Sequence, residues 1–156
     1  MHADKIPKLL YELIKNSRRS DRDLAKVLGF SQPTVTRTRR KLEEDKYVLQ
    51  YTAIPDFTKL EFELVAFTFV QWLPEGAKGE SPYKWLEKDP RVVFMAEGSG
   101  LDGKNALIVT LHRNYTDYSQ FTSELHKTKT VQASSVFMSA LMDIKKHFTL
   151  SGLEKV

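Results

Sequence analysis

The sequence contains no cysteine. Disulfide scaffolds, iron–sulfur clusters, thiolate zinc sites and cysteine nucleophiles are therefore excluded. Long apolar runs are also missing, since stretches such as Leu64–Val70 are far shorter than the ~20 residues that cross a bilayer. No charged-then-apolar leader opens the chain. We therefore expect a cytoplasmic protein that has no membrane partner.

Signatures of catalysis and of metal binding are also missing. The four histidines show no metal-ligand spacing with each other or with a carboxylate, so we expect neither a metal site nor a cofactor. The glycine-rich stretch 98–103 lacks the Lys-Ser or Lys-Thr ending of a phosphate loop, and no GxSxG or HExxH motif occurs. These absences predict that the protein is not an enzyme and has no catalytic residues.

The charge of the chain is unevenly distributed. Of the 156 residues 41% are hydrophobic, which is enough for a packed core. Residues 1–50 hold 12 basic and 7 acidic side chains, whereas residues 51–156 hold 12 and 13. Such an asymmetry favours a nucleic-acid-binding part joined to a part with another role. A merely solvated basic face is the alternative.

The first 46 residues show the periodicity of three helices. Apolar residues recur at helical spacing from Ile6 to Ile14. A second helix is predicted to begin after Ser20 as N-cap and to end at Gly29, and a third to run from Ser31 or Gln32 to about Asp45. The last two helices and their glycine turn indicate a helix-turn-helix. The β-rich stretch Tyr47–Ile54 favours its winged variant.

In a helix-turn-helix the second helix of the motif enters the major groove of DNA. On the third helix of this chain, Val35, Thr38 and Leu42 are expected to face inward, which leaves a basic outer face. Arginine can bind guanine bidentately, and threonine or glutamine can read thymine or adenine. Arg22 and its basic neighbours are expected to hold phosphates. The candidates on the third helix are Gln32, Pro33, Thr34, Thr36, Arg37, Arg40 and Lys41.

The remainder of the chain alternates strand and helix signals. Short helices are expected at Tyr83–Lys88 and after Thr116 as cap, and a loop at Pro74–Pro82. The order β-α-β-β-α-β is that of a ferredoxin-like unit, so the predicted class is α+β. We expect a winged helix-turn-helix domain at 1–54, a hinge at 55–63 and the ferredoxin-like domain at 64–156. The four predicted strands are Leu64–Trp72, Val92–Glu97, Asn105–His112 and Gln132–Met142.

The predicted strands are apolar on both faces. Two helices cover only one face of a four-stranded sheet, and an antiparallel sheet with one wet face would alternate apolar and polar residues. The second face therefore needs a partner, which we expect to be the same sheet of a second chain. Coverage by the N-terminal domain or by the C-terminal tail is the alternative.

Residues 20–53 resemble the helix-turn-helix of the Lrp/AsnC (feast/famine) family of prokaryotic transcription regulators. The matching points are DLAK, the corner GFS, TV followed by Arg37, KLEEDK, and YTA. The resemblance implies double-stranded operator DNA as partner and homodimers through the C-terminal sheets, often assembled into tetramers or octamers. It also implies a small effector, often an amino acid, and it adds Ser31 to the DNA-contacting residues.

Three positions depart from the family pattern. Lys46 stands where glycine is usual, and Arg39 stands where an apolar residue is usual. In the effector region of the family, a glycine followed by an aspartate opens the third strand. Here that strand opens with Asn105, and Asp102 lies in the preceding turn. Gly100, Asp102 and Asn105 are the candidate effector residues, and a different ligand, or none, stays open.

Two other functions remain open at this point. Some haem-pathway decarboxylases have a similar two-domain fold, and His112, Arg113 and His126 are then the candidates to hold tetrapyrrole propionates. An architectural protein that binds DNA with little sequence preference is the other.

Overall fold

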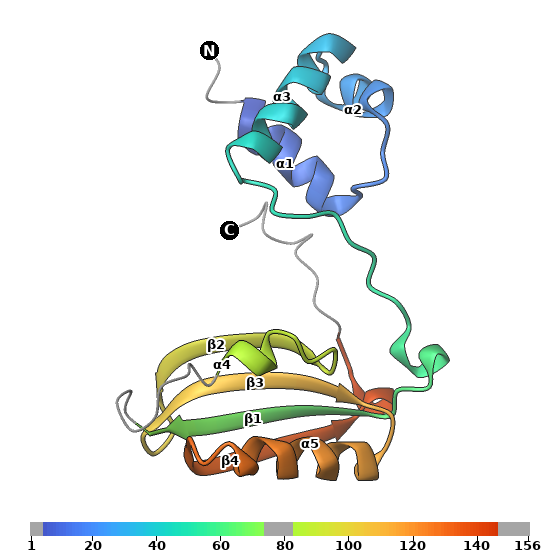
Figure 1. Cartoon of the computed structure of the whole chain (residues 1–156). Helices are drawn as coiled ribbons and strands as arrows, with labels where there is room; N and C mark the ends of the chain where they lie inside the picture. The colour runs from blue at the N-terminus through green and yellow to red at the C-terminus, as the bar shows by residue number, and fades with distance from the viewer. Residues whose placement is uncertain (1–4, 74–82, 147–156) are drawn as a thin grey trace. The chain divides into compact units, whose positions relative to one another are not determined.

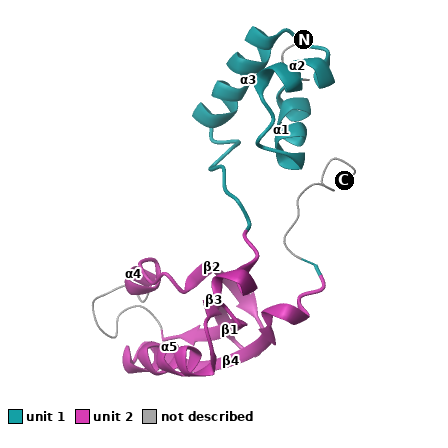
Figure 2. Cartoon of the chain, turned by 90° about the vertical axis from the view of Figure 1, so that its right-hand side faces the viewer, with its two compact units in different colours: residues 1–54, 146–156 teal, residues 55–145 magenta. Residues whose placement is uncertain are grey.

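The computed structural model describes residues 5–73 and 83–146 (Figure 1). Within these ranges no helix is both long and apolar enough to cross a membrane. The chain divides into two compact units, residues 1–54 with 146–156 and residues 55–145 (Figure 2). The loop predicted at Pro74–Pro82 lies outside the described residues. The predicted α+β class is confirmed, with a helical first part followed by a four-stranded sheet.

The described part of the first unit contains three helices: α1 (Lys5–Lys15), α2 (Asp21–Leu28) and α3 (Gln32–Glu44). The predicted ends of α2 are confirmed, because the Ser20 side chain accepts a hydrogen bond from the amide of Asp23 and Gly29 adopts φ +67°. The helices enclose a small apolar core whose buried members are Leu9, Leu13, Leu24, Ala25, Val35 and Leu42.

The predicted wing strand is wrong. Among the described residues, 48–54 form neither strand nor helix, and all four strands belong to the second unit. A strand needs a neighbour to pair its backbone N–H and C=O groups, and the first unit offers none. Val48 instead donates its amide hydrogen to the carbonyl of Leu42 and packs against the helical core. The Tyr51 hydroxyl donates to Glu43 Oε1 at 2.9 Å, on the last turns of α3.

The second unit has the predicted β-α-β-β-α-β order, and its strands pair antiparallel in the order β2-β3-β1-β4. The short helix η1 (Phe57–Leu60) precedes the sheet and η2 (Leu141–Asp143) follows it. Between them lie β1 (Leu64–Trp72), α4 (Tyr83–Leu86), β2 (Val92–Gly100), β3 (Lys104–His112), α5 (Tyr115–Lys127) and β4 (Val131–Ala140).

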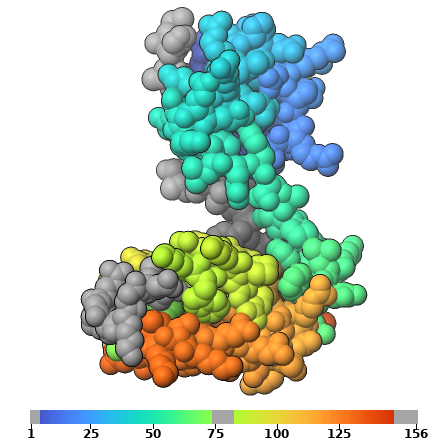
Figure 3. Space-filling view, in the orientation of Figure 1, coloured from blue at the N-terminus to red at the C-terminus, as the bar shows by residue number. Residues whose placement is uncertain are grey.

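Both helices α4 and α5 lie on the same face of the sheet (Figure 2), and this face of the second unit is turned toward the viewer in Figure 3. Leu86 of α4 and Phe121 and Leu125 of α5 pack there against Val70 and Ile108, and all five are fully buried. Burying a large apolar side chain contributes about 1.5–3 kcal/mol, so this cluster stabilises the unit.

The opposite face of the sheet is apolar and largely uncovered, and we call it the open face. Phe94 and Phe137 are 52% and 63% exposed there. Between them on the two central strands lie the half-buried side chains of Phe67, Phe69, Leu107 and Val109.

One end of the open face is closed by residues from outside the strands. Phe57 and Phe62, from the stretch expected to be a hinge, pack with Leu141 against Val65 and Leu111. The Phe57 and Phe62 rings meet edge to face. The closure leaves most of the face open, including the two exposed phenylalanines.

Candidate nucleic-acid interface

Helix α3 presents the predicted DNA-contacting residues on its outer side. Its inward face is fixed by Val35 and Leu42, which are 1% and 0% exposed. Pro33 stands in the first turn, where a helix does not need the missing N–H. The exposed members of the predicted set are Ser31, Gln32, Pro33, Thr36, Arg37, Arg40 and Lys41.

Positive charge dominates this surface. Over residues 5–73 and 83–146, neither Arg37 nor Lys41 takes part in an ion pair. Arg40 Nε lies 2.7 Å from Glu44 Oε1, but both side chains are more than half exposed, and such a surface pair is worth about 0–1 kcal/mol. A DNA phosphate can therefore easily replace Glu44 as the partner of Arg40. Arg22 is also exposed, on α2.

Two threonines of helix α3 are half-buried. Thr34 is half-buried, and its Oγ1 lies 2.8 Å from Ser31 Oγ. Thr38, which was expected to face inward, is also half-buried, and its hydroxyl donates to the Thr34 carbonyl at 2.8 Å. The side chain of Thr36 is exposed, yet its hydroxyl also has partners within the protein, as described below.

A carboxylate of α2 contacts α3 beside this surface. Arg39 Nε donates to Asp21 Oδ1 at 2.8 Å, and the same guanidinium donates to the backbone carbonyl of Arg19 at 3.1 Å. Asp21 Oδ2 accepts from the Thr36 hydroxyl at 2.7 Å. Sequence reasoning did not select Asp21. The sequence feature that could have indicated Asp21 is Arg39, since a cation at a usually apolar position needs a carboxylate within reach.

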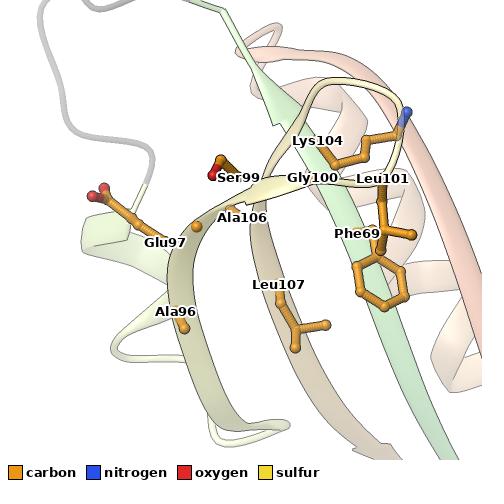
Figure 4. A pocket seen from close by; sticks show the side chains of 10 residues that line it. Phe69, Ala96, Glu97, Ser99, Gly100, Leu101, Lys104, Ala106 and Leu107 are labelled. Atoms are coloured by element: carbon orange, nitrogen blue, oxygen red, sulfur yellow. The ribbon is translucent and has the colours of Figure 1, made fainter.

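A cavity of about 250 Å³ lies at the β2–β3 hairpin (Figure 4). Phe69, Leu101 and Leu107 contribute apolar walls, and the hairpin backbone around Gly100 completes it. Glu97 is also at the edge, but in Figure 4 its side chain is directed away from these apolar groups. The cavity is therefore mostly apolar.

Of the three candidate effector residues, only Gly100 lines this cavity. Asp102 lies in the turn of the hairpin with φ +56°. The Asn105 side chain instead holds the end of β1, because its Oδ1 accepts from the Trp72 amide at 2.8 Å. The structure thus does not bring the three residues together around one space.

The histidines of the second unit do not converge on a shared site. His112 is fully buried, with Nε2 2.7 Å from Thr110 Oγ1 and Nδ1 3.4 Å from Asp117 Oδ2. Burial lowers the pKa of His112 below its ordinary value, although the nearby Asp117 opposes the shift. His126 is exposed on α5. No group of three His, Asp or Glu side chains able to hold a metal occurs in the described ranges.

Known proteins are similar to this chain in sequence and in fold. The AsnC-type helix-turn-helix domain matches residues 5–43. PH1692 of Pyrococcus horikoshii, named as an uncharacterized HTH-type transcriptional regulator, is 24% identical over 92% of this chain and 93% of that protein. The regulator FL11 of the same organism is 28% identical over 62% of this chain and 64% of its own length.

Solved structures share the fold over nearly the whole chain. An AsnC family regulator from Agrobacterium tumefaciens superimposes with a TM-score of 0.77 at 21% identity, over 93% of this chain and 92% of that one. The regulator NMB0573 of Neisseria meningitidis, solved as a complex with L-Met, gives a TM-score of 0.78 at 21% identity, over 92% and 91%.

These matches confirm the resemblance that the sequence indicated: the chain contains an AsnC-type helix-turn-helix domain, has the fold of Lrp/AsnC regulators and is similar in sequence to proteins named HTH-type transcriptional regulators.

Proposed function

We propose that the protein is a transcription regulator that binds operator DNA through α3. The observation that carries the proposal is the exposed basic face of this helix, with Arg37, Arg40 and Lys41 at its centre. Such a helix fits the major groove, where guanidinium groups bind guanine O6 and N7 and ammonium groups neutralise phosphates. Arg22, exposed on α2, is proposed to contact a phosphate and so to set the register. Operator binding would take place in the cytoplasm.

We further propose that the chain acts as a homodimer or a higher oligomer. Monomeric proteins rarely expose a contiguous apolar patch of this kind, and a second copy of the same sheet covers it symmetrically. Phe94 and Phe137 would then become buried in the dimer interface. Dimerisation would also present two copies of α3 to the two halves of a palindromic operator.

A small-molecule effector is the third part of the proposal. The apolar cavity at the β2–β3 hairpin supports it, as does the structural neighbour solved with L-Met. Because its walls are apolar, an effector with an apolar side chain fits this cavity best. Gly100 is the candidate effector residue that lines it.

The decarboxylase alternative has less support. It requires His112 to reach a propionate, but His112 is fully buried between Thr110 and α5. Since the relatives found by sequence are named transcriptional regulators, we propose that the protein is not an enzyme.

Measuring DNA affinity after Arg37→Ala tests the proposal. We expect specific affinity to fall by ~1–3 kcal/mol if Arg37 contacts a base, because a bidentate contact is lost. Arg113→Ala is the matched control, since it removes an exposed arginine from the second unit. Equal affinity of the wild type and Arg37→Ala would contradict the assignment. Equal affinity for a promoter fragment and for bulk DNA would favour the architectural alternative.

A further inference from the structure

The hydroxyl of Thr36 is hydrogen-bonded to two acceptors within the protein. Its Oγ1 lies 2.7 Å from Asp21 Oδ2 and 3.1 Å from the carbonyl oxygen of Gln32. An ionised carboxylate and a carbonyl can only accept hydrogen bonds, so the single hydroxyl proton of Thr36 is donated to them. The oxygen of this exposed side chain is therefore directed toward α2.

Asp21 is itself fixed in place. Its other oxygen, Oδ1, accepts from Arg39 Nε at 2.8 Å, and the two side chains are only 21% and 19% exposed. Arg39 is anchored a second time by the backbone carbonyl of Arg19. A partly buried pair with several hydrogen bonds holds its geometry better than an exposed one. Arg39 also neutralises a carboxylate that would otherwise repel a DNA phosphate.

The remaining branch of the Thr36 side chain is a methyl group. Thr36 lies on the outer side of α3, one residue before Arg37 and one turn before Arg40. A threonine methyl is one of the groups that contact the C5-methyl of thymine in the major groove. We propose that Thr36 reads a thymine through its methyl group, and that Asp21 is the positioning residue that keeps the hydroxyl away from the bases. This inference rests on the proposed binding of DNA by α3.

The test begins with a random-sequence DNA pool, from which the full wild-type chain selects its preferred duplex. Each thymine of that duplex is then replaced by uracil, which lacks only the C5-methyl. At one position in each half-site, the replacement should weaken wild-type binding about fourfold, as expected for about 0.8 kcal/mol per buried methyl-sized group. Thr36→Ser, which lacks the methyl, should bind both duplexes equally. Thr36→Val, which keeps a methyl, should still prefer thymine.

Two further variants separate this role from stability. Thr122→Ser removes a methyl from a threonine of α5 whose hydroxyl donates to the Tyr118 carbonyl in the same manner, and it should retain the wild-type preference for thymine. Asp21→Ala removes the shorter of the two hydrogen bonds of the Thr36 hydroxyl and leaves only the Gln32 carbonyl at 3.1 Å, so it should weaken the thymine preference. The preference is a ratio of two affinities, and a general loss of affinity leaves that ratio unchanged.

The outcomes distinguish the two proposals. If wild-type binding depends on Arg37 but Thr36→Ser discriminates uracil from thymine as the wild type does, the inference about Thr36 is wrong and DNA binding by α3 stands. A thymine preference that is lost in Thr36→Val and kept in Thr36→Ser would show that the preference depends on the Thr36 hydroxyl and not on its methyl group, and would equally overturn the inference. If the wild type selects no sequence and Arg37→Ala changes nothing, the proposed function itself fails.

Discussion

At the scale of single residues, the burial of His112 links stability to pH. The ring packs against Tyr118 and Phe121 and is fully buried, which lowers its pKa below the ordinary value of 6.5. In the unfolded chain His112 binds a proton at higher pH than in the folded chain. His112 therefore stabilises the fold fully above the unfolded pKa, and this contribution falls as the pH drops toward the lower folded pKa.

We expect the free energy of unfolding to decrease as the pH is lowered from about 7 to about 5. Urea denaturation at a series of pH values measures the free energy of unfolding. His112→Gln should flatten the curve in this window, whereas His126→Gln replaces an exposed histidine of the same unit and is the matched control. An unchanged pH profile in His112→Gln would show that other groups cause the dependence.

Lys46 and Arg39 show how departures from a family pattern are accommodated. Lys46 adopts φ +61°, the left-handed conformation that glycine accepts without strain. The usual glycine at this position thus has a backbone reason, which the structure shows. Arg39 is accommodated by Asp21, and this partner lies 18 residues away in sequence. Local periodicity does not predict such a pair.

At the scale of elements, the start of α5 shows where sequence reasoning reaches its limit. The helix was predicted correctly, but Thr116 was expected to cap it. In the structure Asn114 is the N-cap, and its side chain accepts from the Asp117 amide at 3.0 Å. Asparagine and threonine both cap helices, so residue type alone did not distinguish between two positions so close together.

Asn114→Ala should therefore lower the free energy of unfolding by about 0.5–2 kcal/mol, because it removes the cap. Thr116→Ala, two residues later and exposed, should have a much smaller effect. Chemical denaturation of both variants measures the difference. A larger loss in Thr116→Ala than in Asn114→Ala would contradict the capping assignment.

The strands were predicted more reliably than the segment after α3. β1 was predicted at Leu64–Trp72 and is found there, because its apolar run is bounded by clear breaks. Tyr47–Ile54 has the same β-rich composition but forms no strand, since pairing depends on a neighbour that a local pattern does not supply. For the DNA-binding candidates, helical spacing predicted the exposed side chains apart from half-buried Thr34, but it did not predict that the Thr36 hydroxyl donates to Asp21.

At the scale of the whole molecule, the open face makes dimerisation testable. Phe137 is 63% exposed, and its ring lies 6.0 Å from that of Phe67. Phe137→Glu would place an unpaired charge in the proposed interface, which costs several kcal/mol, and should convert dimers to monomers. Sedimentation velocity at micromolar concentration measures this change.

Tyr115→Glu is the matched control for Phe137→Glu, because it introduces the same charge at an exposed aromatic residue of α5, outside the open face. It should retain the association state of the wild type. A wild-type monomer at micromolar concentration, or an unchanged oligomer in Phe137→Glu, would overturn the proposed interface.

The central claim, DNA binding by the basic face of α3, is tested most directly by the salt dependence of DNA affinity. Each phosphate contact contributes about −0.9 to the slope of log K against log salt concentration. An Arg37→Ala/Arg40→Ala double variant should lose specific affinity and, for each phosphate contact removed, shift that slope toward zero by about one. Fluorescence anisotropy with the selected duplex measures both quantities. Wild-type affinity together with a wild-type salt slope in the double variant would contradict the claim.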